Sequence, residues 1–403
     1  MTGSAEETDL VLRGGQIAEV AEPVDIVVRH GVIAEIGPAA TAPANAQAVD
    51  LEGRLVLPGL VDAHCHLDKT LFGGPWVPHP AGDALSDRIA SERRLRSSLG
   101  VPDVGRITTL LEAMVAAGTT HVRSHTDIAP ELGLSGVEEI DEAATRMAGR
   151  IDIQQVVFPQ YGILREPGTA ELMAEALAQG VEVVGGIDPA GIDGDPVQHL
   201  DIVFDLVERY GKRIDIHLHD GGTLGTWQLE LICDRTVALG LQGRVTVSHA
   251  YGLGQAVPDE QRRLADRLAE AGITITTAAV YNFPVPSLRI LRASGVNVAS
   301  GHDGIRDLWG PYGTGDMLDR AMHLAYRSTF RRDDDIELAL QAATSGGATA
   351  LGLPSHGLIV GAPADLVVVR ASHPAEAVVT RPVRDLVFKR GRLVTRDGAC
   401  IGP

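Results

Sequence analysis

The sequence predicts a (β/α)8 barrel of the TIM type joined to a small β-sandwich domain built from both ends of the chain. Eight short apolar runs separated by longer amphipathic segments predict the barrel, because parallel strands need helical crossovers between them. Short, half-alternating runs near both termini predict the sandwich. We expect the sandwich to comprise residues 1–57 and 356–403, and the barrel to comprise residues 58–355.

The two ends of the chain carry the same strand-like pattern, with glycine at the turns. The N-terminal runs are LVLRGGQIAEV (10–20), DIVVRHGVIAEIG (25–37) and AVDLEGRLVLPG (48–59); the C-terminal runs are ADLVVVR (364–370) and DLVFKRGRLVTRDG (385–398). Alternation of apolar and polar residues is typical of strands with one buried face. We therefore expect both ends to contribute to one domain.

The middle of the chain contains the candidate barrel strands. They are GLVDAHCH (59–66), THVRSH (120–125), IQQVVFP (153–159), VEVVGGID (181–188), RIDIHLH (213–219), RVTVSH (244–249), ITITTAAV (273–280) and VNVASGHD (296–303). The segments between them have helical periodicity, and several end in glycine, which is typical of a helix stop. A doubly wound open sheet is the rival fold, but no glycine-rich phosphate loop follows the first run.

Composition excludes several classes of protein. Hydrophobic residues make up 44% of the 403 residues and aromatic residues only 4%, which predicts an aliphatic core. No apolar run is long enough to span a membrane. The net charge of −18 argues against a nucleic-acid partner, since phosphate binding needs clustered Lys and Arg. We expect a cytoplasmic protein, because Met1–Asp9 lacks the pattern of a secretory signal and three scattered cysteines (Cys65, Cys233 and Cys400) form no disulfide framework.

Polar residues stand at or just beyond the ends of nearly all the predicted strands. They are His64, His66, His125, Gln160, Asp188, His217, His219, His249 and Asp303. Because the carboxyl ends of all barrel strands meet at one face, these side chains are expected to converge there. This face is therefore the predicted catalytic face.

The spacing of the histidines points to a metal site. His64 and His66 lie two residues apart in a strand, so both side chains point to the same face. His217 and His219 repeat this spacing on the fifth run. Three imidazoles and the carboxylate of Asp303 suit Zn²⁺ or Fe²⁺ and leave one position for a water molecule, whose pKa the metal would lower.

Two residues are candidates for delivering a proton to a leaving group. His219 stands beside the expected metal ligand, and Asp220 follows at the mouth of the strand, although it could instead cap the next helix. A nucleophilic side chain is disfavoured because Cys65 points to the opposite face from the histidines, and no serine stands in a G-x-S-x-G elbow. His125 and His302 are expected to have supporting roles.

The segments LPGLVDAHCHLDKT, DIHLHDGGTLG, RVTVSHA and GHDGIRDLWGPYGTGDML together resemble the amidohydrolase superfamily over essentially the whole chain. Within this superfamily, the chain resembles the cytosine deaminase branch, and within that branch it is similar to enzymes that remove alkylamines from s-triazine rings. The resemblance implies one divalent metal, Zn²⁺ or Fe²⁺, and assigns roles to seven residues. The metal ligands are His64, His66, His217 and Asp303; His249 assists the attack, Gln160 contacts the ring and Trp309 lies near the pocket.

Two departures from the family pattern affect the expected site. Cytosine deaminases carry a glutamate where this chain has Asp220, which disfavours cytosine itself. Binuclear members carry a carboxylated lysine at the end of the fourth strand, where this chain has no lysine, so a single metal is expected. Asp188 is then free to contact a ring N–H or an amine, and Lys69 to approach a substrate oxygen.

The expected function is metal-dependent hydrolysis of an amino or alkylamino group from an s-triazine-like or pyrimidine-like ring. Asp303 would take the proton of the attacking water, and His219 or Asp220 would protonate the departing amine. Three alternatives remain: a cytosine-, isocytosine- or pterin-type deaminase that releases ammonia, a metal-binding scaffold without catalysis, and a cyclic amidase, which the missing lysine disfavours. The expected partner is a small nitrogen heterocycle, and a homo-oligomer is expected.

Overall fold

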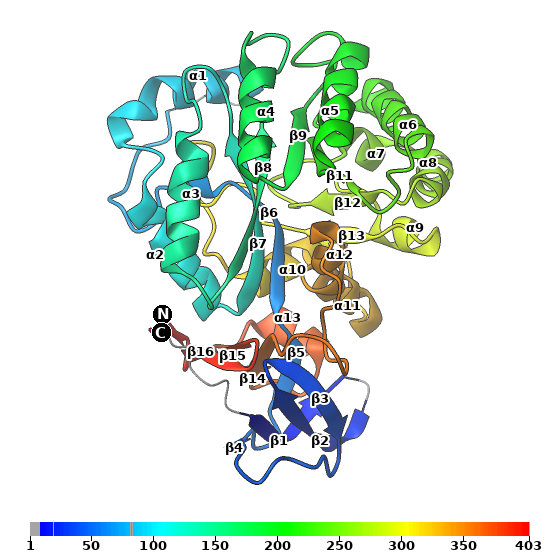
Figure 1. Cartoon of the computed structure of the whole chain (residues 1–403). Helices are drawn as coiled ribbons and strands as arrows, with labels where there is room; N and C mark the ends of the chain where they lie inside the picture. Colours follow the sequence, from blue (N-terminus) through cyan, green and yellow to red (C-terminus); the bar gives the residue numbers. More distant parts are fainter. Residues whose placement is uncertain (1–8, 19, 81, 83, 403) are drawn as a thin grey trace.

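The computed structural model describes residues 9–18, 20–80, 82 and 84–402. The acidic start of the chain at residues 1–8, on which the expectation about a secretory signal depended, lies outside these residues. The chain forms a barrel with a smaller β domain at one end of it, and strands from the beginning and the end of the chain lie together in that domain (Figure 1). The architecture confirms the fold class predicted from the sequence.

Eight parallel strands form the barrel, and each pairs with the next strand along the chain. They are β6 (Leu60–Cys65), β7 (Thr119–Asp127), β8 (Asp152–Phe158), β9 (Val183–Ile187), β10 (Arg213–His217), β11 (Val245–Ser248), β12 (Thr274–Thr277) and β13 (Val298–Ser300). The last strand returns to the first, since the backbone N–H of Asp303 donates to the carbonyl of His64 at 2.9 Å. Each of the eight predicted runs overlaps one of these strands; six runs contain their strand completely, whereas β7 and β8 extend beyond theirs.

Helices connect and cover the barrel strands. They are α1 (Leu85–Leu95), α2 (Val104–Ala116), α3 (Ser135–Arg146), α4 (Thr169–Gln179), α5 (Pro196–Tyr210), α6 (Gly222–Ala238), α7 (Tyr251–Gln255), α8 (Pro258–Glu270), α9 (Leu288–Ala293), α10 (Met317–Arg327), α11 (Asp333–Ala342) and α12 (Ser345–Leu351), with 3-10 turns at Leu67–Lys69 and Ser97–Leu99. Side-chain caps begin several of them: Asp103, for example, accepts from the N–H of Arg106. Leu200, Val203 and Val207 show how one apolar stripe of a helix, here α5, is buried against the barrel.

The sandwich consists of two sheets whose facing sides enclose an aliphatic core. One sheet contains β1 (Leu10–Ile17), β2 (Val20–Arg29), β3 (Val32–Gly37) and β4 (Gln47–Asp50); the other contains β5 (Leu55–Pro58), β14 (Leu366–Val369), β15 (Arg384–Lys389), β16 (Arg392–Arg396) and β17 (Ala399–Cys400). Pairing of Gln16 in β1 with Leu55 in β5 joins the two sheets, so that all nine strands are connected. A short helix that the sequence pattern did not predict, α13 (Pro374–Thr380), lies between β14 and β15 and contacts α10 and α11.

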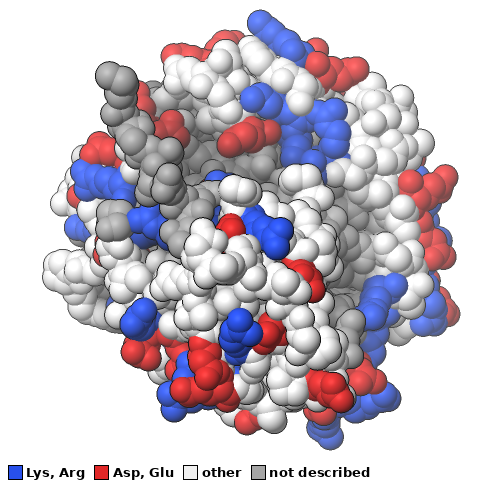
Figure 2. Space-filling view, turned by 60° about the horizontal axis from the view of Figure 1, so that its bottom comes forward, with Lys and Arg blue, Asp and Glu red and all other residues white. Residues whose placement is uncertain are grey.

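The surface of the sandwich end is mixed in charge. Figure 2 shows acidic and basic side chains interspersed among broad uncharged areas on this face. Among the helices that the structure describes, none combines the length with the apolar composition that a membrane span requires.

Candidate active site

The functional residues predicted from the sequence lie at or beyond the carboxyl ends of the barrel strands. β6 begins beside the sandwich, so these ends lie at the opposite end of the barrel (Figure 1). Asp188, His249 and Asp303 each follow a strand with a positive φ, of 31°, 70° and 66°. Residues in this conformation are uncommon outside glycine and concentrate at functional sites, where the surrounding structure holds them. The backbone thus turns abruptly where the polar side chains enter the site.

Four side chains converge as a candidate metal centre: His64, His66, His217 and Asp303. One ligand atom from each lies within 4.8 Å of the others. Asp303 Oδ1 is 3.3 Å from His66 Nε2 and 3.6 Å from His64 Nε2, and His217 Nε2 is 3.4 Å from His66 Nε2. A tetrahedral ion with bonds of about 2.0–2.1 Å holds its ligand atoms about 3.4 Å apart. The spacing of these atoms therefore suits a first-row divalent ion.

Outer contacts fix the rings of the first two histidines with Nε2 toward the centre. His64 Nδ1 lies 2.9 Å from the hydroxyl of Ser248, which donates to Asp215 at 2.7 Å, and His66 Nδ1 lies 3.1 Å from the carbonyl of His125. If both Nδ1 atoms donate, both Nε2 lone pairs face the centre, as metal ligation requires. His64 Nε2 is buried with no hydrogen-bond partner among the described residues, which a bound metal would supply.

The ionisation states also suit a cation. Burial lowers the pKa of His66 and holds the pKa of His217 well below its usual value, so both rings are neutral and keep a lone pair. Burial alone would raise the pKa of Asp303, but the nearby imidazoles of His64 and His66 hold it well below the usual range. Three imidazoles and one carboxylate are a donor set for Zn²⁺ or Fe²⁺. The residues present therefore fit a divalent metal.

Barrel closure at this centre depends on Gly301. A Cβ at this position would lie 2.4 Å from the carbonyl oxygen of His64, which pairs with the N–H of Asp303. We expect Gly301→Ala to push β13 away from β6, to destabilise the protein by about 1–3 kcal/mol, and to lower its content of bound metal. Thermal unfolding and elemental analysis measure both. Gly37→Ala is the control, since a Cβ there meets nothing within 4 Å; equal behaviour of the two variants would contradict the expectation.

His219 and His249 lie side by side next to the metal centre, with ring centroids 4.4 Å apart. Both oxygens of Asp188 face His219: Oδ2 is 2.7 Å from Nδ1, and Oδ1 accepts from the backbone N–H groups of His219 and Asp220. Burial would lower the pKa of His219, but the charge and hydrogen bond of Asp188 raise it. Both carboxylate oxygens of Asp188 are thus engaged with His219 and Asp220, and the substrate contact expected from the sequence stays a prediction.

Asp220 has protein partners rather than a place beside the metal ligands. Its Oδ2 accepts from the backbone N–H of Gly191 at 2.9 Å and from the amide of Gln228 at 2.8 Å. These bonds tie the loop after β9 to α6. Of the two proton-donor candidates, the geometry favours His219.

Lys69, Gln160 and Trp309 form a second group, which is connected through Lys69. Lys69 Nζ donates to Gln160 Oε1 at 2.5 Å and forms an ion pair with Asp127 at 3.1 Å. It also lies 5.3 Å from the ring centroid of Trp309. The lysine expected to approach a substrate oxygen therefore holds two other predicted pocket residues.

Several residues of this region escaped the sequence analysis. Phe158 ends β8 and stacks on His217 with centroids 4.1 Å apart. The second strand extends past His125 to Asp127, a carboxylate at the strand end that fits the rule used for the other strands.

His125 and His302 lie where the sequence analysis expected supporting residues. His125 is fully buried, with its ring close to those of His64 and His217, and His302 pairs with Asp62 at 2.7 Å.

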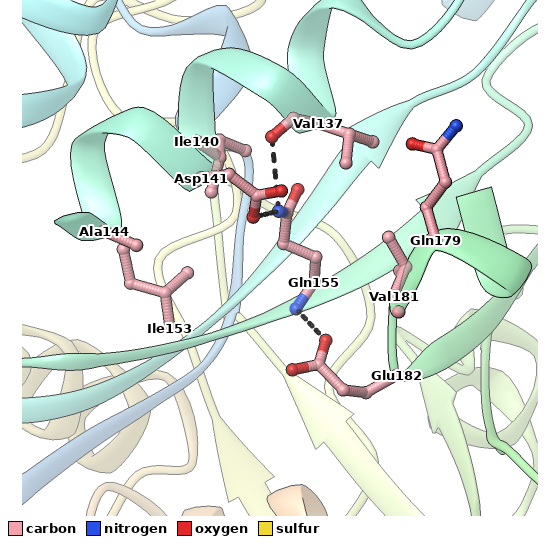
Figure 3. A pocket seen from close by; sticks show the side chains of 10 residues that line it. Val137, Ile140, Asp141, Ala144, Ile153, Gln155, Gln179, Val181 and Glu182 are labelled. Carbon is pink, nitrogen blue, oxygen red and sulfur yellow. Dashed lines mark hydrogen bonds between the residues drawn. The ribbon is translucent and has the colours of Figure 1, made fainter.

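A cavity of about 210 Å³ lies away from these residues, between α3, β8 and the loop after α4 (Figure 3). Gln155 connects the two carboxylates that line it, since the backbone N–H of Gln155 donates to Glu182 and its side-chain amide donates to Asp141. None of the predicted site residues lines it.

The barrel, the histidine pair on its first strand and the aspartate after its last strand define a metal-dependent hydrolase that acts on carbon–nitrogen bonds. Residues 103–401 match the model of the amidohydrolase family, and the chain belongs to that family. The match covers most of the barrel and the C-terminal strands of the sandwich.

Particular relatives are similar over nearly the whole chain. N-isopropylammelide isopropyl amidohydrolase of Pseudomonas sp. (strain ADP) is 32% identical over 355 residues, 87% of this chain and 88% of the relative. The crystal structure of N-isopropylammelide isopropylaminohydrolase from Burkholderia multivorans is 44% identical, with a TM-score of 0.94 over 98% of this chain and 100% of the other. That of 5-methylcytosine deaminase from Klebsiella pneumoniae with 5-fluorocytosine is 26% identical, with a TM-score of 0.84 over 96% and 97%.

Proposed function

We propose that this protein hydrolyses an alkylamino group from a hydroxylated s-triazine ring, with N-isopropylammelide as the first candidate substrate. The observation that carries the proposal is the His219–Asp188 pair beside the four-residue metal centre. In the proposal, this pair supplies the proton that the departing amine needs. The 32% and 44% identities to the two isopropylammelide enzymes support this choice of ring and leaving group.

We infer that His64, His66, His217 and Asp303 hold one divalent metal, with Zn²⁺ the first choice for three nitrogen donors and one oxygen donor. The metal supplies Lewis acidity that makes a water molecule nucleophilic near neutral pH. Asp303 Oδ1 faces the histidines, which leaves Oδ2 to accept the proton of the attacking water. His249 Nε2 is buried and without a partner among the described residues, which supports a role for it in hydrogen-bonding the attacking oxygen.

The departing amine takes its proton from His219. Nδ1 of His219 is held by Asp188, so Nε2 is the atom that faces the substrate and donates. The C–N bond breaks as the new C–O bond becomes the ring carbonyl, the hydroxyl proton passes to the adjacent ring nitrogen, and the amine leaves neutral. The proton on Asp303 then restores His219, so one water is consumed and one amine is released.

The direct test supplies the purified enzyme, stripped with a chelator and reloaded with Zn²⁺ or Fe²⁺, with N-isopropylammelide, ammelide, cytosine and 5-methylcytosine. We expect the enzyme to release isopropylamine from N-isopropylammelide and to be active only when metal is added. We also expect kcat/KM to be highest for N-isopropylammelide. A higher kcat/KM for cytosine, with release of ammonia, would make the protein a pyrimidine deaminase. A metal-loaded enzyme inert toward all four would leave the scaffold alternative. The cytoplasmic location and the homo-oligomer remain predictions.

A further inference from the structure

A buried carboxylate on α1 reaches the candidate pocket from outside the barrel strands. α1 belongs to the connection between β6 and β7 and lies at the end of the barrel opposite the sandwich (Figure 1). Glu92 is only 2% exposed, although most of the helix around it is polar. A buried carboxylate requires charged or hydrogen-bonding partners, and its partners show what it organises.

Glu92 holds two residues of the pocket at once. Its Oε2 accepts from the indole N–H of Trp309 at 2.8 Å and lies 3.5 Å from Lys69 Nζ. Arg96, one turn further along the chain, contacts Oε1 of Glu92 at 3.7 Å and pairs with Asp127 at 2.6 Å. The indole N–H is thereby occupied, so Trp309 can offer the pocket only its ring.

Lys69 connects Glu92 to Gln160. An ammonium group only donates hydrogen bonds, so the atom of Gln160 at 2.5 Å from Lys69 Nζ must be the amide oxygen. The amide NH₂ of Gln160 then faces away from Lys69 and stays available as a donor. Since Lys69 lies between Gln160, Asp127 and Glu92, its three protons are all directed at protein atoms.

We propose that Glu92 is a positioning residue that fixes the donor face of the substrate pocket. By holding Trp309 directly and Gln160 through Lys69, it makes the pocket present an NH₂ donor beside a flat aromatic ring. The group that occupies this subsite must accept a hydrogen bond, as a carbonyl oxygen or an unprotonated ring nitrogen does. The inference rests on the proposed function, because it assigns this edge of the substrate ring to Gln160.

The test compares Glu92→Gln and Glu92→Ala with the wild type, all loaded with the same metal. The amide of Gln can still accept from Trp309 and Lys69, whereas Ala removes both contacts and leaves Lys69 its ion pair with Asp127. We expect KM to rise about threefold in Glu92→Gln and about tenfold or more in Glu92→Ala, with kcat within about threefold and metal content unchanged. Glu131→Gln, which weakens a surface ion pair with Arg93, is the matched control.

Two readouts separate positioning from a merely structural role. The first is the preference for an oxo ring over its thioxo analogue, a poorer acceptor, which should shrink in Glu92→Ala and persist in Glu92→Gln. The second is the near-ultraviolet circular dichroism of Trp309, with Trp309→Phe as the blank, which needs no turnover.

If Glu92→Ala kept the wild-type KM, oxo preference and Trp309 signal, the proposal would be overturned. If Glu92→Ala does not fold, Glu92→Gln decides the matter. A threefold higher KM with the wild-type oxo preference and Trp309 signal then supports the proposal, whereas a lower kcat at constant KM overturns it. Wild-type inactivity on every ring instead defeats the proposed function, while the Trp309 signal still decides the placement of Glu92.

Discussion

Replacing Asp303 with Asn should lower kcat by at least about 10³-fold, which corresponds to roughly 4 kcal/mol of transition-state stabilisation. The carboxylate contributes a negative donor to the metal centre and, in the proposed mechanism, accepts the proton of the attacking water; an amide does neither well. Asn tolerates the positive φ of 66° at this position, so the backbone turn should survive. Steady-state kinetics with excess metal, elemental analysis and thermal unfolding together measure the effect.

A remote aspartate provides the matched control for this variant. Asp397 also has a positive φ, of 50°, and is exposed in the turn between β16 and β17 of the sandwich. Asp397→Asn should leave kcat and metal content unchanged. Activity of Asp303→Asn within about tenfold of the wild type, at full metal occupancy, would remove Asp303 from the reaction.

The barrel could be predicted because buried parallel strands are nearly continuous apolar runs, and eight of them alternate with helical segments. The end of the second strand was placed too early, at His125, since the polar residues that follow resemble a loop. In the structure all nine residues of β7 are buried, and the strand ends at Asp127. Polar side chains inside a barrel have partners on other strands, which a local pattern does not reveal.

The side chains that converge on the site were predictable, but their partners were not. Strand spacing alone indicates that His64 and His66 share a face. The bond from Lys69 to Gln160 joins residues 91 positions apart, and that from His219 to Asp188 joins residues 31 apart. Glu92 has no strand-end signal at all, since it lies on a polar helix in a long connection. These pairings follow from how the loops pack over the barrel.

Replacing His219 with Gln should make the reaction strongly dependent on the basicity of the leaving amine. A basic alkylamine such as isopropylamine is a poor leaving group unless it is protonated as the C–N bond breaks, and loss of the general acid should lower kcat for it by about 10²–10⁴-fold. A ring carrying a trifluoroethylamino group, whose amine is far less basic, should lose only about tenfold. Kinetics of the two substrates with the wild type and His219→Gln give this ratio directly.

Two neighbouring carboxylates show whether the effect belongs to the imidazole. Asp188→Asn keeps the shape of the partner but removes the charge that raises the pKa of His219, so it should shift selectivity in the same direction by a smaller factor. Asp220→Asn should leave the ratio of the two substrates unchanged and only lower the thermal stability, since its carboxylate bonds Gly191 and Gln228. Equal losses of kcat on both substrates in His219→Gln would show that His219 is not the proton donor. A changed ratio of the two substrates in Asp220→Asn would assign that role to Asp220.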